Sequence, residues 1–162
     1  MDVLLATYNE MILSINMGNI DGHVSVSKPL YIITLIEAIE WEALKENKIE
    51  LSNAYLHTRF GQLYEQVNGN RKGYGSSFFI RPYYHLASAP FYHLVWKIGK
   101  RPPMKSHTPS AKYLHDFLHY AKLDDELWNL LQYAENRECF RRNIIKRYLK
   151  LTTNILQNGY KI

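Results

Sequence analysis

Residues 30–36 read Leu30-Tyr31-Ile32-Ile33-Thr34-Leu35-Ile36, a stretch that is apolar nearly all round. Pro29 stands directly before it, and proline suits the first turn of a helix because its missing N–H would have no partner inside the helix there. A helix that is apolar on every side is buried on every side. We therefore expect a central helix that begins near Pro29 and emerges to solvent from Glu40 onward, with the other elements packed around it.

Apolar residues at helical spacing mark five further segments of the chain. They are residues 3–17, 53–66 and 110–120, a short helix with Asp124 as its N-cap, and a final helix from about Glu135. Residues 17–27 and 68–76 contain glycines and polar residues typical of loops.

Residues 78–97 form aromatic and apolar runs that Pro82 and Pro90 interrupt. This composition predicts short irregular strands or a hairpin at the edge of the molecule. The expected fold class is therefore α+β, a predominantly helical single domain over residues 1–162 with a small irregular β element around 78–97.

Charge is distributed unevenly along the chain, whose net charge is +5. Residues 1–70 hold four Lys/Arg and nine Asp/Glu, a balance of −5, whereas residues 71–162 hold sixteen and six, a balance of +10. The acid-free gap between Glu65 and Asp116 includes Lys100, Arg101, Lys105 and Lys112. Such patterning indicates a polyanionic partner, with nucleic acid as the first candidate and a merely solvated basic surface as the alternative.

The start of the chain and its single cysteine favour a cytoplasmic protein. The first ten residues include Asp2 and Glu10 and have no basic start before an apolar stretch, so no secretory signal is expected. Glu37 interrupts the longest apolar stretch, which therefore cannot span a membrane. Cys139 is the only cysteine and is expected to be a small core residue.

Candidate catalytic groups are sparse. His115 and His119 have the spacing of two zinc ligands on a helix, but Asp116 stands where zinc proteases have Glu, and no third ligand follows at a characteristic distance. Glu37 and Glu40 could pair as acids, yet both are expected to face solvent. No phosphate loop or serine nucleophile elbow is present in the sequence. We expect no catalytic residues, no bound metal and no cofactor.

The richest constellation is Phe78-Phe79-Ile80-Arg81-Pro82-Tyr83-Tyr84-His85-Leu86, followed by a second aromatic run over residues 89–97. Rings interleaved with Arg, His and Lys can stack on nucleic acid. Phe79, Leu86, Leu94 and Trp96 are instead expected to lie in the core.

Three pieces of the chain resemble, in order, the sulfur-binding domains at the N-terminus of phosphorothioate-dependent restriction endonucleases. They are a Lys-Pro-Leu helix start at residues 28–30, a Pro-aromatic-aromatic-x-Leu element at residues 82–86 with a second aromatic strand at 91–94, and a C-terminal helix pair that includes residues 123–131 and Arg137. The resemblance spans roughly residues 5–150. Three positions differ from the family, with Ser27 before the lysine, Arg81 before the proline and His85 where small residues can stand.

The resemblance implies a domain that recognises DNA in which sulfur replaces a backbone oxygen. Pro82 would form the wall of an apolar cup for the sulfur, completed by Tyr83 and His85. Lys28 and Arg81 would hold the flanking phosphates. Apart from the resemblance, Lys100, Arg101 and Lys105 lie in an acid-free, proline-bounded loop and Lys112 lies in the same acid-free gap, so these residues are expected to contact phosphates.

The expected function is accordingly that of a non-catalytic, stand-alone DNA-binding module of a restriction or defence system, without the family's nuclease domain. Whether the ligand is sulfur-modified, base-modified or plain DNA is left open by the sequence. One alternative is a protein-interaction subunit that recruits a separate nuclease through the acidic N-terminal half. The other is a metal hydrolase that uses His115 and His119.

Overall fold

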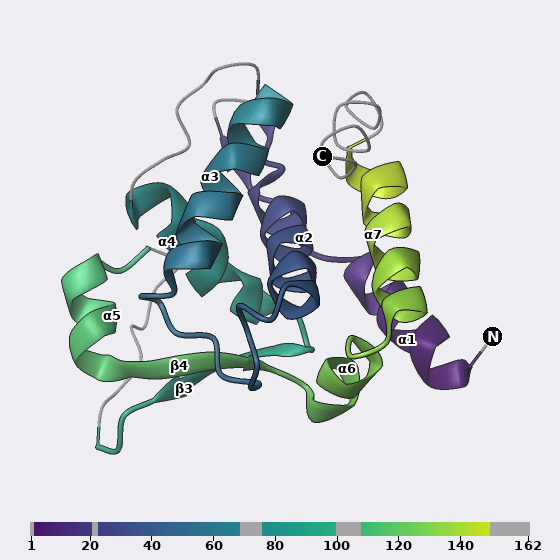
Figure 1. Cartoon of the computed structure of the whole chain (residues 1–162). Coiled ribbons are helices and arrows are strands. Elements are labelled where there is room, and N and C mark those ends of the chain that lie inside the picture. The colour runs from purple at the N-terminus through teal and green to yellow at the C-terminus, as the bar shows by residue number, and fades with distance from the viewer. Residues whose placement is uncertain (1, 21–22, 69–75, 100–107, 150–162) are drawn as a thin grey trace.

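The computed structural model describes residues 2–20, 23–68, 76–99 and 108–149, and its central element is helix α2, Ser27–Glu40. Every residue from Pro29 to Ile39 is buried, which confirms the central helix that the apolar stretch predicts. Figure 1 shows α3 (Ala54–Asn68) and α4 (Ser76–His85) on one side of α2, with α7 (Ala134–Tyr148) and α1 (Val3–Ile12) on the other. Helices therefore cover both flanks of α2.

A small antiparallel sheet lies across one end of these helices (Figure 1). Strand β3, Tyr92–Trp96, pairs with β4, Leu118–Leu123, and Tyr92 lies opposite Leu123. Ile49 adds one bridge on the far side of β4, because its N–H donates to the Ala121 carbonyl at 2.7 Å and its carbonyl accepts from the Ala121 N–H at 2.9 Å. A second hairpin joins β1 (Asn19–Ile20) to β2 (His23–Val24), within a segment expected to be a loop.

Residues 76–85 are helical, so the strand prediction for the first part of the β element is wrong. Phe79, Tyr83 and Leu86 follow one another at intervals of four and three residues and are all buried against the core. This helical spacing outweighs the preference of aromatic residues for strands. The β3 part of the prediction is confirmed, and a short 3₁₀ helix, Leu86–Ser88, connects the two.

Helix α5 is also shorter than expected. It spans Ala111–Phe117, with the Ser110 hydroxyl as the N-cap acceptor for the Tyr113 N–H. Residues 118–123 form β4 because β3 and Ile49 offer hydrogen bonds on both of its sides. Tertiary pairing here overrides a sequence that continues the helical spacing.

Asp124 precedes α6 (Asp125–Leu130), as expected, but its carboxylate does not cap that helix. It accepts a hydrogen bond from the Tyr8 hydroxyl at 2.7 Å and pairs with His93 Nε2 at 2.5 Å. Asp124 thus ties α1 and β3 to the start of α6.

The core contains a chain of tyrosine hydroxyls that joins α2, α4 and β3. Tyr92 donates its single hydroxyl proton to the Tyr83 carbonyl at 2.6 Å, so Tyr31 must be the donor in the 2.9 Å contact between the Tyr31 and Tyr92 hydroxyls. The Tyr83 hydroxyl donates in turn to the Ile49 carbonyl at 2.7 Å. Buried hydroxyls are satisfied in this way, and three elements are fixed to one another.

Helix α2 ends in a Schellman motif at Glu42, which has a positive φ of 59°. The Ala43 N–H donates to the Ala38 carbonyl at 2.8 Å and the Glu42 N–H donates to the Ile39 carbonyl at 3.2 Å. Glu42 therefore occupies the left-handed position that glycine usually takes.

Glu37 does not face solvent as the sequence suggested. It is buried on α2, and its carboxylate accepts from Arg59 Nε of α3 at 2.9 Å. Helix packing supplied the partner that makes its burial tolerable.

Candidate nucleic-acid interface

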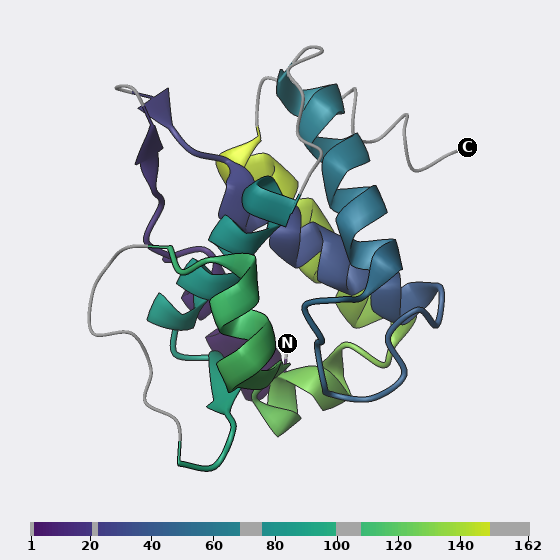
Figure 2. The same cartoon turned by 90° about the vertical axis from the view of Figure 1, so that its left-hand side faces the viewer.

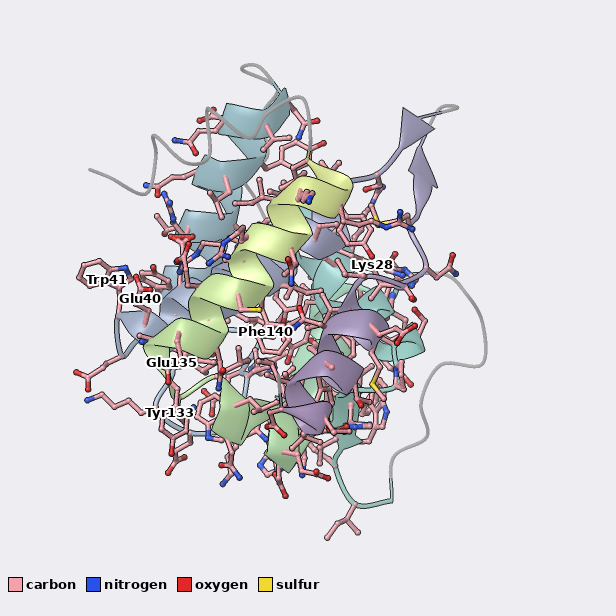
Figure 3. The ribbon with its side chains drawn as sticks, turned by 90° about the vertical axis from the view of Figure 1, so that its right-hand side faces the viewer. Lys28, Glu40, Trp41, Tyr133, Glu135 and Phe140 are labelled. Atoms are coloured by element: carbon pink, nitrogen blue, oxygen red, sulfur yellow. The ribbon has the colours of Figure 1, made fainter. Side chains whose placement is uncertain are left out.

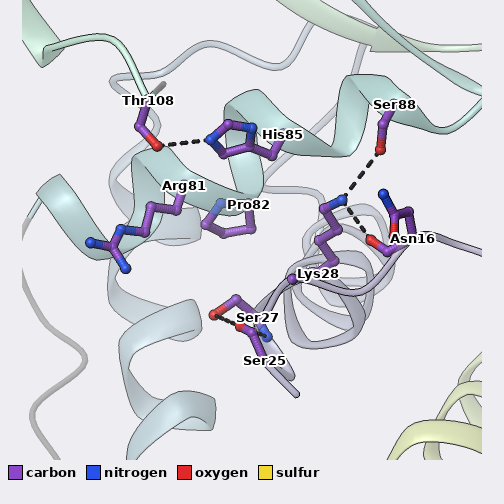
Figure 4. A pocket seen from close by; sticks show the side chains of 10 residues that line it. Asn16, Ser25, Ser27, Lys28, Arg81, Pro82, His85, Ser88 and Thr108 are labelled. Carbon is purple, nitrogen blue, oxygen red and sulfur yellow. Dashed lines mark hydrogen bonds between the residues drawn. The ribbon is translucent and has the colours of Figure 1, made fainter. Parts of the chain in front are cut away.

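A pocket of about 400 Å³ lies where α4 meets the start of α2 (Figure 4). Its lining comes from four separate parts of the chain: Asn16, Gly18, Ser25, Ser27, Lys28, Arg81, Pro82, His85, Ser88 and Thr108. None of these described lining residues carries a carboxylate, whereas three of them are basic in type. The pocket is therefore suited to an anion.

Pro82 forms a buried apolar part of the pocket wall, between Arg81 and Lys28 in Figure 4. It lies inside α4, where its ring has no backbone N–H to donate. The wall at this point offers a rigid hydrocarbon surface to a ligand and no hydrogen-bond donor.

Lys28 is held in place by two hydrogen bonds. Its Nζ donates to the Asn16 carbonyl at 2.6 Å and to the Ser88 hydroxyl at 3.2 Å. Partial burial lowers the pKa of Lys28 from its ordinary value. An ammonium group has three N–H donors, so one remains for a ligand in the pocket. The side chain is thus a positioned cation whose burial makes an incoming negative charge favourable.

His85 and Arg81 lie one helical turn apart on α4, on the same side as Pro82 (Figure 4). The ring of His85 is joined by Nε2 to the Thr108 hydroxyl at 2.8 Å. Burial, followed by the charges of Lys28 and Arg81, lowers the pKa of His85 below its usual value. Arg81 is exposed, and its guanidinium extends away from the pocket in Figure 4. Burial and the two neighbouring cations therefore favour the neutral form of this imidazole in the free pocket.

The structure brings together four of the residues that the sequence proposed for DNA binding: Lys28, Arg81, Pro82 and His85. Tyr83 is instead turned into the core, where its hydroxyl meets the Ile49 carbonyl, so it does not complete the cup. Lys112 is exposed on α5, paired with Asp116 at 3.2 Å, and does not line the pocket.

Lys100, Arg101 and Lys105 lie outside the described residues. Their role stays a prediction.

Sequence reasoning missed most of the polar lining, namely Asn16, Ser25, Ser88 and Thr108. Ser27 was noted only as a difference from the family that the sequence resembles. Ser25 donates its hydroxyl to that of Ser27 at 3.1 Å. No sequence signal identifies Ser88 or Thr108, because each reaches the pocket only through a contact with Lys28 or His85 across the fold.

The proposed zinc pair is not supported by the geometry. His115 is on α5 and His119 is on β4, so the two residues are not one helical turn apart. In the described part of the chain, no group of three or more His, Cys, Asp or Glu side chains could hold a metal ion. No helix among the described residues is both long enough and apolar enough to cross a membrane.

Comparison with known proteins gives matches at the level of structure. No profile of a known protein family matches the chain, and no curated protein matches it in sequence. A solved structure of the sulfur-binding domain of ScoMcrA, complexed with phosphorothioated DNA, matches with a TM-score of 0.66 at 15% identity, over 89% of this chain and 88% of that one. A longer structure, the sulfur-binding and SRA domains of ScoMcrA with the same kind of DNA, matches with a TM-score of 0.69 at 15% identity.

The second match covers 88% of this chain but 42% of the longer ScoMcrA chain, so it is confined to part of that chain. The expected fold class, α+β with mostly helices, is confirmed by these matches and by the elements of the structure. This chain is therefore similar in fold, over nearly all of its described length, to the sulfur-binding domain of ScoMcrA.

Proposed function

We propose that the chain is a non-catalytic DNA-binding module of a restriction or defence system, and that it recognises a phosphorothioate at the pocket around Pro82. One observation carries the proposal: Lys28, Arg81, Pro82 and His85 converge on one pocket. The ScoMcrA domain with the same fold was solved with phosphorothioated DNA, which supports this ligand class. Neither the recruiting subunit nor the metal hydrolase finds comparable support.

The chemistry of the pocket suits sulfur. Sulfur is larger and more polarizable than oxygen and is less strongly hydrated, so contact with an apolar ring favours it over oxygen. Pro82 supplies that ring, since its buried edge has no donor that would prefer oxygen. Lys28 and Arg81 then contact phosphate oxygens, which position the strand without reading its sequence.

The three positions that differ from the related family all line this pocket: Ser27, Arg81 and His85. Each of them places a polar or charged side chain at the pocket lining. A measured preference for sulfur over oxygen would therefore show that this pocket takes the same ligand as the family that the sequence resembles, and no preference would show that its ligand differs.

The decisive experiment compares two duplexes of the same sequence, one with a single phosphorothioate, at several salt concentrations. Tighter binding of the modified duplex at every salt concentration supports the proposal. Equal binding of both duplexes would show that the pocket binds DNA without reading sulfur. Failure to bind either duplex would overturn the DNA-binding function itself.

Pro82→Ala tests the apolar wall. Loss of the ring should reduce the preference for sulfur about five- to tenfold, which corresponds to roughly 1–1.4 kcal/mol of apolar contact. Binding to unmodified DNA should stay nearly intact, because Lys28 and Arg81 remain. Fluorescence anisotropy with the two duplexes measures both quantities.

Pro90→Ala is the matched control, since Pro90 is exposed and lies outside the pocket. If both variants lost the same degree of preference for the phosphorothioate duplex, contact with the Pro82 ring would not be the cause of that preference.

A further inference from the structure

A second exposed surface lies at the C-terminal end of α2, and we call it the Trp41 surface. It comprises Trp41, Tyr133, Glu40, Glu42 and Glu135. The Trp41 side chain is 68% exposed and Tyr133 is 60% exposed, and these are two of the four large hydrophobic residues exposed among those described. Figure 3 shows Trp41, Glu40, Glu135 and Tyr133 in this order along one edge of the molecule, with Lys28 near the opposite edge.

A buried arginine joins the two elements that carry the Trp41 surface. Arg141 of α7 is buried beneath it, and its guanidinium donates to Glu40 at 3.1 Å and to Glu138 at 2.8 Å. The end of α2 and the first turns of α7 are thereby joined by a charge-assisted contact. Trp41 and Tyr133 are carried by these two joined elements, so their relative positions are set by the fold.

Two residues of the Trp41 surface, Glu42 and Trp41, lower the stability or the solubility of the chain when no partner is bound. Glu42 has a left-handed φ of 59° at a position where glycine would be unstrained. An indole that is 68% exposed adds little packing and leaves apolar area in water. Local choices that oppose stability or solubility are typical of functional surfaces.

We infer that the Trp41 surface docks a partner protein through arginine side chains of that partner. A guanidinium group stacks on an indole or phenol ring and at the same time pairs with a carboxylate beside it. Trp41 and Tyr133 offer the rings. Glu135 lies between them in Figure 3, Glu42 follows Trp41 in the sequence, and both glutamates are exposed. Trp, Tyr and Arg are also the residue types that contribute most to protein interfaces.

DNA does not fit this surface, because the carboxylates would repel phosphates. The Trp41 surface is also separate from the DNA pocket, since Lys28 stands at the second residue of α2 and Trp41 follows its last residue. The two surfaces can be tested independently, and the docking inference does not require the pocket to read sulfur.

The test uses a fluorescein-labelled hexa-arginine peptide and the full chain without DNA, at low and moderate salt. We expect the wild-type chain to bind the peptide and Trp41→Ala or Tyr133→Ala to weaken binding at least fivefold. Trp41→Phe should retain part of the affinity, because the phenyl ring still stacks on guanidinium. Val3→Ala and Ile98→Ala remove exposed hydrophobic side chains elsewhere and should leave peptide binding unchanged.

Absence of peptide binding by the wild-type chain would overturn the inference, as would equal losses in the Ile98 and Trp41 variants. Thermal unfolding of each variant, followed by circular dichroism, identifies any variant that is not folded, and Trp41→Phe then serves in place of Trp41→Ala. DNA binding by the Trp41 and Tyr133 variants should stay within twofold of wild type, which separates failure here from failure of the proposed function.

Discussion

Pro82 is an unusual residue for its place, the seventh of ten in helix α4. A proline inside a helix removes one backbone hydrogen bond and costs about 3 kcal/mol relative to alanine. Its ring is buried at the wall of the pocket, where hydrocarbon is exposed to a ligand and not to bulk water. A destabilising choice at this point is consistent with a role in binding.

We expect His85 to make the proposed DNA binding dependent on pH. In the free chain its pKa is lowered by burial and by Lys28 and Arg81. A phosphate in the pocket favours the imidazolium form and raises that pKa, so binding takes up a proton. Affinity should therefore increase as pH falls through the bound-state pKa and should level off below the free-state pKa, which lies under 6.5.

His85→Gln should remove this pH dependence while keeping a polar contact to Thr108. Isothermal titration in buffers of different ionisation enthalpy between pH 5.5 and 8 measures the proton uptake. His119→Gln is the control, since His119 is exposed on β4 and outside the pocket. Unchanged proton uptake in the His85 variant would assign the pH dependence to another group.

The sequence predicted some pocket residues correctly through the resemblance and misplaced others because it did not predict helix α4. Lys28 and Pro82 are 54 positions apart in the sequence, and only the resemblance grouped them. Tyr83 was expected to complete the cup together with His85, but successive residues on a helix point about 100° apart. The helix therefore directs Pro82 to the pocket and Tyr83 to the core.

At the scale of elements, the end of α2 offers a clear test of backbone strain. Glu42→Gly should raise the free energy of unfolding by about 0.5–1 kcal/mol, because glycine adopts a positive φ without steric cost and gives back part of that gain as chain entropy. Urea denaturation measures the change. Lys45→Gly, three residues further along and without a positive φ, should instead destabilise the chain by a similar amount. Destabilisation by both substitutions would contradict the strain at Glu42.

The tyrosine chain that joins α2, α4 and β3 gives a second prediction at this scale. Tyr92→Phe removes the hydroxyl that satisfies the Tyr83 carbonyl and accepts from Tyr31. Both partners stay buried, so the loss should be about 1–3 kcal/mol of unfolding free energy. Tyr133→Phe, at an exposed ring, should change stability by less than about 0.5 kcal/mol. Urea denaturation followed by circular dichroism distinguishes the two.

Elements were predictable where one physical signal dominated. The helix α2 follows from apolar residues on all sides, and α7 begins within one residue of its expected start. For α4 the spacing of Phe79, Tyr83 and Leu86 was already helical, yet Pro82 and the aromatic content pointed to strands. For β4 the sequence held no such signal, because its conformation depends on Ile49 and on β3, both distant in the chain.

At the scale of the whole molecule, the basic half of the sequence should determine how binding depends on salt. Each phosphate contact contributes about 0.9 to the logarithmic salt slope on duplex DNA. Arg81→Gln should weaken binding to any sequence and flatten that slope by about 0.9, because Arg81 is exposed beside the pocket. Anisotropy titrations from 50 to roughly 200 mM salt measure the slope.

Arg142→Gln is the matched control, since Arg142 is exposed on α7 and does not line the pocket. An equal change of slope in the two variants would mean that the general charge of the molecule, and not the pocket, sets the salt dependence.

The length of α2 has a consequence for a partner that docks at the Trp41 surface. Its 14 residues form a buried helix that links the pocket around Pro82 at one end to the Trp41 surface at the other. At 1.5 Å per residue this helix is about 20 Å long, and 20 Å corresponds to about six base pairs of duplex. A partner docked at the Trp41 surface would therefore be held at about this distance from DNA bound in the proposed pocket, because one helix carries both surfaces.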